Sequence, residues 1–216
     1  MEPTTLQITW FILFGILIGG YAILDGFDLG VGFLSMFTKK SNDRRLMINA
    51  VGPVWDGNEV WLVTGGGALF AAFPPIYATS FSSFYLAIML LLLALIARAV
   101  SMEFRGKVNS PSWRRIWDWA FGLGSTIAAV LFGVAVGNIM TGIPLDENHM
   151  FTGNFLSLLH VHPIAMGLLS LAMFATHGAL YMAIKSEGPL ASSMVANAKK
   201  SWIGWMVTFV GASATA

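Results

Sequence analysis

Four carboxylates interrupt two long apolar segments of this sequence, and they are the residues best suited to chemistry. Asp25 and Asp28 lie in the segment DGFDLGVG, and Asp56 and Glu59 lie in GPVWDGNEVWL. The spacing i, i+3 places the two acids of each pair on one face of a helix. Carboxyl groups that are buried and crowded can bind and release protons near neutral pH. The pattern indicates proton transfer, provided that these segments are buried helices.

The composition indicates that the elements holding these acids are membrane helices. Of the 216 residues, 56% are hydrophobic and 11% are charged; the mean hydropathy is +0.71 and the formal net charge is +1. An ordinary soluble domain carries about 25% charged residues. These values exclude a disordered chain, a basic nucleic-acid-binding domain and a typical water-soluble globule. The sequence has no cysteine, which excludes disulfides, zinc–thiolate sites, iron–sulfur clusters and cysteine-attached haem.

A transmembrane helix needs about 20 mostly apolar residues, and the sequence contains five such segments and a shorter sixth. The predicted fold is therefore all-α, a polytopic transmembrane helix bundle with five complete spans and a truncated sixth. Because the last segment is short, we expect residues 1–216 to form a single transmembrane domain that is part of a longer chain. The six segments cover approximately residues 8–37, 50–73, 81–100, 117–140, 155–184 and 202–216.

The loops between the spans predict the orientation of the chain. The loops after the first, third and fifth spans are basic, whereas those at 74–80 and 142–154 contain no Lys or Arg. Basic loops lie on the cytoplasmic side of a membrane, so the N-terminus is predicted to lie outside. The basic residues are Lys39, Lys40, Arg44 and Arg45, then Arg105, Lys107, Arg114 and Arg115, then Lys185, Lys199 and Lys200.

On this topology both acid pairs lie in the cytoplasmic half of the membrane. At a rise of about 1.5 Å per residue, Asp28 lies roughly 13 Å and Asp25 roughly 18 Å from the cytoplasmic end at Phe37. Asp56 lies roughly 9 Å from the matching end of the second span. Such a ladder of acids suits proton uptake from the cytoplasm. Alternatively, Asp25 and Asp28 lie at the membrane interface, because residues 8–24 alone nearly complete a span.

Other polar residues have structural interpretations. Arg98 and Asp118, at the cytoplasmic ends of the third and fourth spans, are predicted to form a buried ion pair. His160 and His162 lie near the outer end of the fifth span, and His177 lies within it. The axial ligands of a b-type haem come from facing helices, so we expect no haem and no metal bound by this chain's own ligands. His177 is instead expected to hydrogen-bond to a neighbouring helix.

Several long motifs, in the same order, resemble subunit II of cytochrome bd-type quinol oxidases. The resemblance covers nearly all 216 residues, and it agrees with a truncated sixth span because subunits of this family have further helices. The motifs are DGFDLGVG, GPVWDGNEVWLVTGGGALFAAFP, RAVSMEFRGK, WRRIWDWAFGLGS, GVAVGNIMTGIP and FTGNFLSLL.

This resemblance implies a haem-free companion of a larger subunit I, which carries haems b558, b595 and d and the quinol-oxidation loop. The complex reduces dioxygen to water with electrons from quinol in the bacterial cytoplasmic membrane. Some members hold a quinone in subunit II, and small single-helix accessory subunits are further expected partners, with no nucleic acid. The resemblance implies no catalytic residue in this chain, a proton pathway through Asp25, Asp28, Asp56 and Glu59, and interface support from Trp55, Arg98 and Asp118.

The residues alone leave two other classes of function open. Intramembrane carboxylates and glycine-interrupted helices also mark cation- or proton-coupled transporters. A purely structural scaffold would use the same acids for stability only. Partnership with a haem-bearing subunit distinguishes the oxidase from the transporter, and the motifs favour the oxidase.

Overall fold

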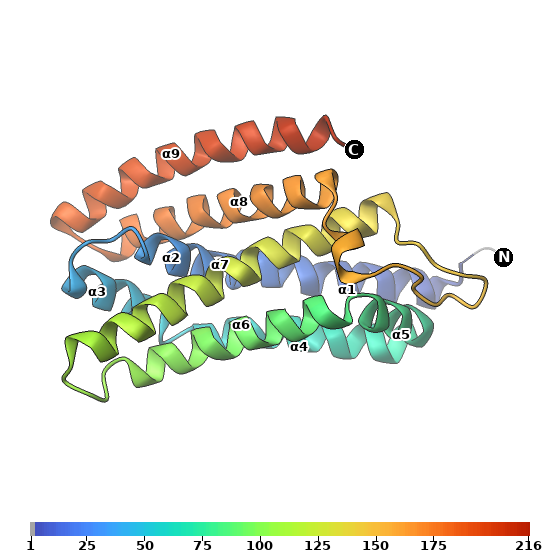
Figure 1. Cartoon of the computed structure of the whole chain (residues 1–216), viewed down its shortest axis with the longest axis horizontal. Coiled ribbons are helices and arrows are strands. Elements are labelled where there is room, and N and C mark those ends of the chain that lie inside the picture. The colour runs from blue at the N-terminus through green and yellow to red at the C-terminus, as the bar shows by residue number, and fades with distance from the viewer. Residues whose placement is uncertain (1–2) are drawn as a thin grey trace.

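The structure is a computed structural model that describes residues 3–216, and its regular elements are helices (Figure 1). The chain order begins with α1 (Thr5–Leu24), α2 (Gly26–Ser35), α3 (Ser41–Val51), α4 (Trp55–Ala72), α5 (Pro74–Ser83) and α6 (Tyr85–Phe104). It continues with α7 (Pro111–Thr141), the 3₁₀ helix η1 (Phe155–Leu158), α8 (Val161–Lys185) and α9 (Gly188–Ser213).

The all-α fold predicted from the sequence is confirmed. Within residues 3–216, four helical stretches are long and apolar enough to cross a membrane: Thr5–Ser35, Tyr85–Phe104, Pro111–Thr141 and Val161–Lys185. They correspond to the first, third, fourth and fifth expected spans. The full number of spans and the orientation of the chain stay predictions.

The helices form a bundle in which chain neighbours pack side by side. In Figure 1, α6, α7, α8 and α9 run alongside one another, and each packs against the next. Helix α2 lies on α7 and α8, whereas α1 packs against α4. Helix α3, the α6–α7 connection and the α8–α9 connection gather at the end opposite to α5 and both termini (Figure 1). The basic loops after the first and third spans therefore meet at one end of the bundle.

Two expected spans have different boundaries in the structure. The stretch at 8–37 is divided at Asp25, where α1 ends and α2 begins, although Asp25 keeps a helical backbone (φ −86°, ψ −17°). The second helix begins at Trp55 instead of residue 50, because Ala50 and Val51 complete α3. The chain then turns through residues 52–54, where proline at position 53 lacks the N–H that a continuous helix needs. Residues 41–49, expected as a loop, belong to α3, whose Met47, Ile48 and Val51 side chains face the core.

The last helix also differs from the prediction. Lys199 and Lys200 were expected in a basic loop before a sixth span at 202–216, but they lie exposed inside α9. The segment between Leu190 and Lys200 contains no glycine or proline, and Met194 and Ala198 are buried one helical turn apart. This apolar stripe holds the first half of α9 against the bundle.

The core is built around close contacts of α2 with α7 and α8. Its largest cluster joins α2, α3, α8 and α9, and a second cluster joins α2, α6, α7 and α8. Gly30 of α2 and Gly178 of α8 allow the two backbones to touch, since a Cβ at Gly178 would lie 2.5 Å from the Gly30 carbonyl carbon. The first cluster comprises Val31, Leu34, Met47, Val51, Ala179, Met182, Leu190, Met194 and Ala198.

Candidate functional site

The junction of α1 and α2 carries two carboxylates into the interior of the bundle. Asp25 is the junction residue and Asp28 lies in the first turn of α2; both are 0% exposed. The neighbouring Gly26 is packed against the Phe174 ring of α8, where a Cβ would lie 2.7 Å from two ring carbons. Helices therefore cover both side chains, and their depth relative to the membrane interface stays a prediction.

Arg98 of α6 is the counter-ion of this acid pair. Its Nη1 lies 2.9 Å from Asp25 Oδ2 and its Nη2 lies 2.5 Å from Asp25 Oδ1, which is a bidentate ion pair. The same Nη2 lies 3.6 Å from Asp28 Oδ2. Arg98 is only 1% exposed. Two carboxylates therefore share one guanidinium, and the fully ionised cluster carries one net negative charge.

Two neutral side chains complete the cluster and make its acids unequal. The Tyr21 hydroxyl donates to Asp25 Oδ2 at 2.7 Å, and Asn58 Nδ2 donates to Asp28 Oδ2 at 2.8 Å and to a backbone carbonyl of α1 at 3.0 Å. Asp25 therefore accepts hydrogen bonds at both oxygens. Asp28 Oδ1, in contrast, is buried and has no hydrogen-bond partner within residues 3–216. Asp28 is thus the acid with an oxygen free to bind a proton.

The second predicted acid pair lies outside this cluster. Asp56 is exposed and Glu59 is partly buried near the start of α4, and within the described chain neither forms an ion pair or a side-chain hydrogen bond. Asn58, between them in the sequence, points instead to Asp28. The structure therefore brings together Asp25 and Asp28 and places the α4 acids toward the bundle surface. Trp55 is partly buried and packs against the larger core cluster.

The predicted Arg98–Asp118 pair is wrong. Asp118 pairs with Arg105, whose Nε lies 2.5 Å from Oδ1, and with Arg44, whose Nε lies 3.0 Å from Oδ2. Arg105 Nη2 also donates to the carbonyl and hydroxyl of Ser41, both at 3.2 Å. Arg98 precedes Arg105 by two helical turns, or roughly 10 Å along α6. Arg98 therefore lies deeper, level with Asp25, while Arg105 meets the start of α7.

His162 and His177 do not face each other from two different helices. His162 and His177 lie on the same helix, α8, roughly 22 Å apart along its axis, so they cannot ligate one haem from two sides. The His177 ring packs edge-on to Phe27 (5.6 Å between centroids) and makes no hydrogen bond to another helix within residues 3–216, contrary to expectation. The described residues contain no group of three or more His, Asp or Glu that could hold a metal ion.

Sequence reasoning missed the residues that differentiate the carboxylates and tie the basic loops together. Tyr21 lies one helical turn before Asp25, and Asn58 is a polar residue in an otherwise apolar segment, so both carried a usable signal. Arg44 and Arg105 were assigned only to basic loops, because sequence does not reveal which arginine meets Asp118.

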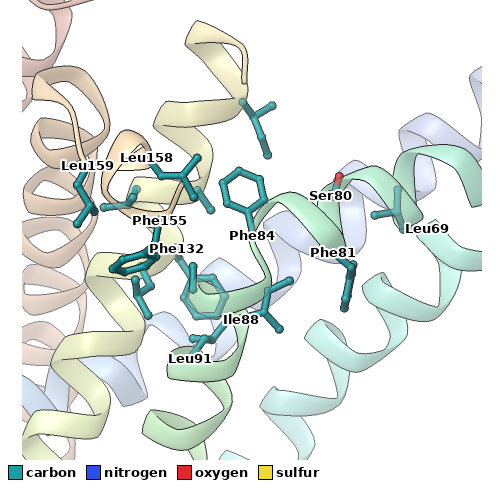
Figure 2. Close-up of a pocket in the computed structure, with 15 residues that line it drawn as sticks. Leu69, Ser80, Phe81, Phe84, Ile88, Leu91, Phe132, Phe155, Leu158 and Leu159 are labelled. Atoms are coloured by element: carbon teal, nitrogen blue, oxygen red, sulfur yellow. The ribbon is translucent and has the colours of Figure 1, made fainter. Parts of the chain in front are cut away.

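An apolar cavity of about 230 Å³ lies toward the other end of the bundle, between α5, α6, α7 and η1. Figure 2 shows Phe84, Phe132 and Leu158 lining it. Ser80 is the only hydroxyl-bearing residue in its wall. The cavity suits a hydrocarbon segment, because it offers almost no polar partner for a headgroup.

The fold and the buried charges define a class: a helical membrane protein with an arginine–carboxylate cluster inside its bundle. Residues 6–216 match the profile of the family described as "Cytochrome bd terminal oxidase subunit II", and the chain belongs to this family. The resemblance carried by the motifs is thereby confirmed.

Curated relatives agree with this family. The chain is 44% identical over 190 residues to "Probable cytochrome oxidase subunit 2" of Haemophilus influenzae, covering 86% of this chain and 50% of the relative. It is 41% identical over 214 residues to "Cytochrome bd-I ubiquinol oxidase subunit 2" of Escherichia coli K12, covering 97% of this chain and 56% of the relative. It is 39% identical over 187 residues to "Cytochrome bd ubiquinol oxidase subunit 2" of Bacillus subtilis, covering 86% of this chain and 55% of the relative. The chain thus spans about half the length of these relatives.

A solved structure shows the same fold. A chain of the bd oxidase from Geobacillus thermodenitrificans superposes with a TM-score of 0.80 over 97% of this chain and 66% of that chain, at 16% sequence identity. The helix arrangement is therefore that of a bd oxidase chain.

Proposed function

We propose that this chain acts as subunit II of a membrane quinol oxidase and that Asp28 carries protons in it. The observation that carries the proposal is the unpartnered, buried Oδ1 of Asp28 beside a guanidinium that Asp25 already occupies. Reduction of dioxygen to water consumes protons, so an oxidase needs groups that take them up inside the membrane. Family membership supplies the reaction class, and the cluster supplies a group suited to the task.

The two acids have different roles in this mechanism. Asp25 is the structural acid of the pair, because a bidentate guanidinium and the Tyr21 hydroxyl hold both of its oxygens. Asp28 binds a proton at Oδ1, and this removes the net negative charge of the cluster. Loss of that proton restores the negative charge of the cluster. Arg98, whose Nη2 lies 3.6 Å from Asp28 Oδ2, reduces the energetic cost of that charge. The cluster therefore alternates between two protonation states without breaking its main ion pair.

The remaining acids extend the route to the surface of the chain. Asn58 links Asp28 to α4, whose next residue is the partly buried Glu59, with exposed Asp56 one turn earlier. A charged side chain on the surface of a membrane helix needs water or a protein partner. We place subunit I, which carries the haems, against α1 and α4. Protons enter from the cytoplasm, the side to which the basic loops are assigned.

The partner holds the electron-transfer cofactors in this proposal. Haems b558, b595 and d belong to subunit I, and the present chain stabilises that subunit and delivers protons toward it. The complex lies in the bacterial cytoplasmic membrane. A structural quinone would place its hydrocarbon tail in the apolar cavity shown in Figure 2. Small single-helix subunits would complete the assembly.

The decisive experiment compares Asp28→Asn with Glu147→Gln in the full-length, two-subunit complex. Glu147 is an exposed acid of the 142–154 loop, so its variant controls for loss of one carboxylate. We expect Asp28→Asn to slow quinol-driven oxygen uptake at least tenfold while the reduced-minus-oxidised haem spectrum is unchanged, and Glu147→Gln to retain full uptake. Normal uptake in Asp28→Asn would remove Asp28 from the pathway. Absence of haem and of a larger co-purifying chain would reject the oxidase and favour the transporter.

A further inference from the structure

A polar cavity, separate from the acid cluster and from the apolar cavity of Figure 2, lies at the end of the bundle where the basic loops meet. Its volume is about 530 Å³, and α3, the end of α6 and the start of α7 form its walls. Three arginines line it, Arg45, Arg105 and Arg114, and no carboxylate does. Ser41, Asn42 and Asn49 add hydrogen-bonding groups. We call this cavity the arginine pocket.

The arginines of this pocket are only partly neutralised by the described residues. Arg105 shares the single carboxylate of Asp118 with Arg44, so two guanidinium groups face one negative charge. Arg114 donates to the neutral side chain of Asn109 at 2.8 Å. Arg45 is exposed and makes no side-chain hydrogen bond or ion pair within residues 3–216. The pocket therefore has excess positive charge and free donors, as an anion site requires.

The apolar surroundings indicate an anion that is attached to hydrocarbon. Ile48 and Met102 belong to the pocket wall itself. Leu46 (46% exposed) follows Arg45 and Phe104 (45% exposed) precedes Arg105, so apolar surface adjoins two of the arginines.

Aromatic residues beside the pocket match the depth of lipid headgroups. Trp113 packs edge-on to Trp117 with 5.5 Å between centroids, and its indole N–H donates to the Phe104 carbonyl at 2.8 Å. Tryptophan is enriched at the membrane–water interface. Basic pockets between helices at this level accept the headgroups of anionic lipids.

We propose that the arginine pocket binds the phosphate group of an anionic phospholipid whose acyl chains lie along α3 and α6. Arg45 and Arg114 contact the phosphate oxygens, and Arg105 is held in position by Asp118 and Ser41. The asparagines and Ser41 are placed to hydrogen-bond a polyol headgroup. The site binds lipid whether or not the acid cluster conducts protons.

The test measures lipid binding to the full-length complex in nanodiscs. After delipidation, the complex is reconstituted with phosphatidylcholine containing a trace of labelled phosphatidylglycerol, and the bound label is counted. We expect the parent to enrich phosphatidylglycerol over labelled phosphatidylcholine, and Arg45→Gln with Arg114→Gln to reduce that enrichment several-fold. The matched control is Lys107→Gln with Lys199→Gln, two exposed lysines outside the pocket wall; this variant is expected to bind as the parent does.

Further arms separate the sources of the anion and guard against misfolding. Excess inorganic phosphate should not displace the label; displacement would show a site for free anions and overturn the lipid proposal. Equal retention of the two labelled lipids by the parent would also overturn the lipid proposal. This result is expected if another part of the complex fills the pocket. Arg45→Gln alone removes no contact within the described chain, so it reports on binding even if the double variant unfolds.

Discussion

Arg98 binds Asp25 through both of its terminal nitrogens, at 2.9 and 2.5 Å, but approaches Asp28 only once, at 3.6 Å. The two neighbouring carboxylates therefore differ in how firmly they are held. Asp25 is part of the scaffold, and Asp28 is the member of the pair with an unused oxygen. This difference gives opposite expectations for two variants that look alike in the sequence.

Asp25→Asn should destabilise the protein, because it leaves the buried Arg98 without its bidentate partner. Breaking a buried ion pair by removing one member costs about 3–5 kcal/mol. The expected result is a clearly lower thermal unfolding midpoint for the purified complex in detergent. Asp28→Asn keeps the main ion pair and should unfold within a few degrees of the parent. If both variants lost the same stability, the acids would be equivalent and the assignment of separate roles would fail.

Asp56→Asn should slow oxygen uptake while the haems remain present. Asp56 is exposed on α4, where it makes no ion pair within the described chain, so its removal costs the fold little. The slower oxygen uptake would result from slower proton delivery between the chain and its partner. Oxygen uptake and the haem spectrum should be recorded together, with Glu59→Gln as a companion variant. Uptake equal to that of the parent would exclude Asp56 from the route.

Asn58→Leu should reduce turnover by removing the donor to Asp28. Asn58 Nδ2 binds both Asp28 Oδ2 and the Leu24 carbonyl, which fixes α4 against the α1–α2 junction. Loss of a hydrogen bond to a charged group costs about 1.5–3 kcal/mol. Asn58→Gln, which retains the amide, should recover part of the uptake. A Leu variant with normal turnover and normal stability would show that this link has no role.

Gly178→Ala should disrupt packing between α2 and α8. The added Cβ would lie 2.5 Å from the Gly30 carbonyl carbon and 2.5 Å from the Val31 amide nitrogen, both backbone atoms. Overpacking of this kind costs about 1–3 kcal/mol. Gly204→Ala on α9 is the control, because no heavy atom lies within 4 Å of its added Cβ. The thermal midpoint should fall for Gly178→Ala and stay level or rise for the control.

Asp118→Asn should loosen the end of the bundle that carries the basic loops. Its two ion pairs join α3, the end of α6 and α7, and both arginines would lose their charged partner. Faster proteolysis within residues 105–115 is expected, without a change in the haem spectrum. Glu103→Gln, an exposed acid of α6, is the matched control and should leave the cleavage rate unaltered. Identical cleavage of the two variants would contradict a structural role for the Asp118 pairs.

Hydropathy and charge were sufficient to predict the helical fold, and the motifs were sufficient to predict the family. They did not reveal α3, because its sequence is polar overall and only Met47, Ile48 and Val51 turn inward. The pairing of Arg98 was predicted wrongly because it depends on the relative heights of α2, α6 and α7. The axial positions of these helices depend on close backbone contacts, such as the contact of Gly30 with α8. Such contacts cannot be read from the sequence alone.

The helix formed by Thr5–Ser35 changes neighbours at Asp25. Its first part packs against α4, and its second part packs against α7 and α8. The residue at this changeover is also the one that the arginine of α6 grips. Because this ion pair is buried and bidentate, it fixes the junction of the two parts to a third helix, α6. A single side chain at position 25 thus joins the α1–α4 pair to the rest of the bundle.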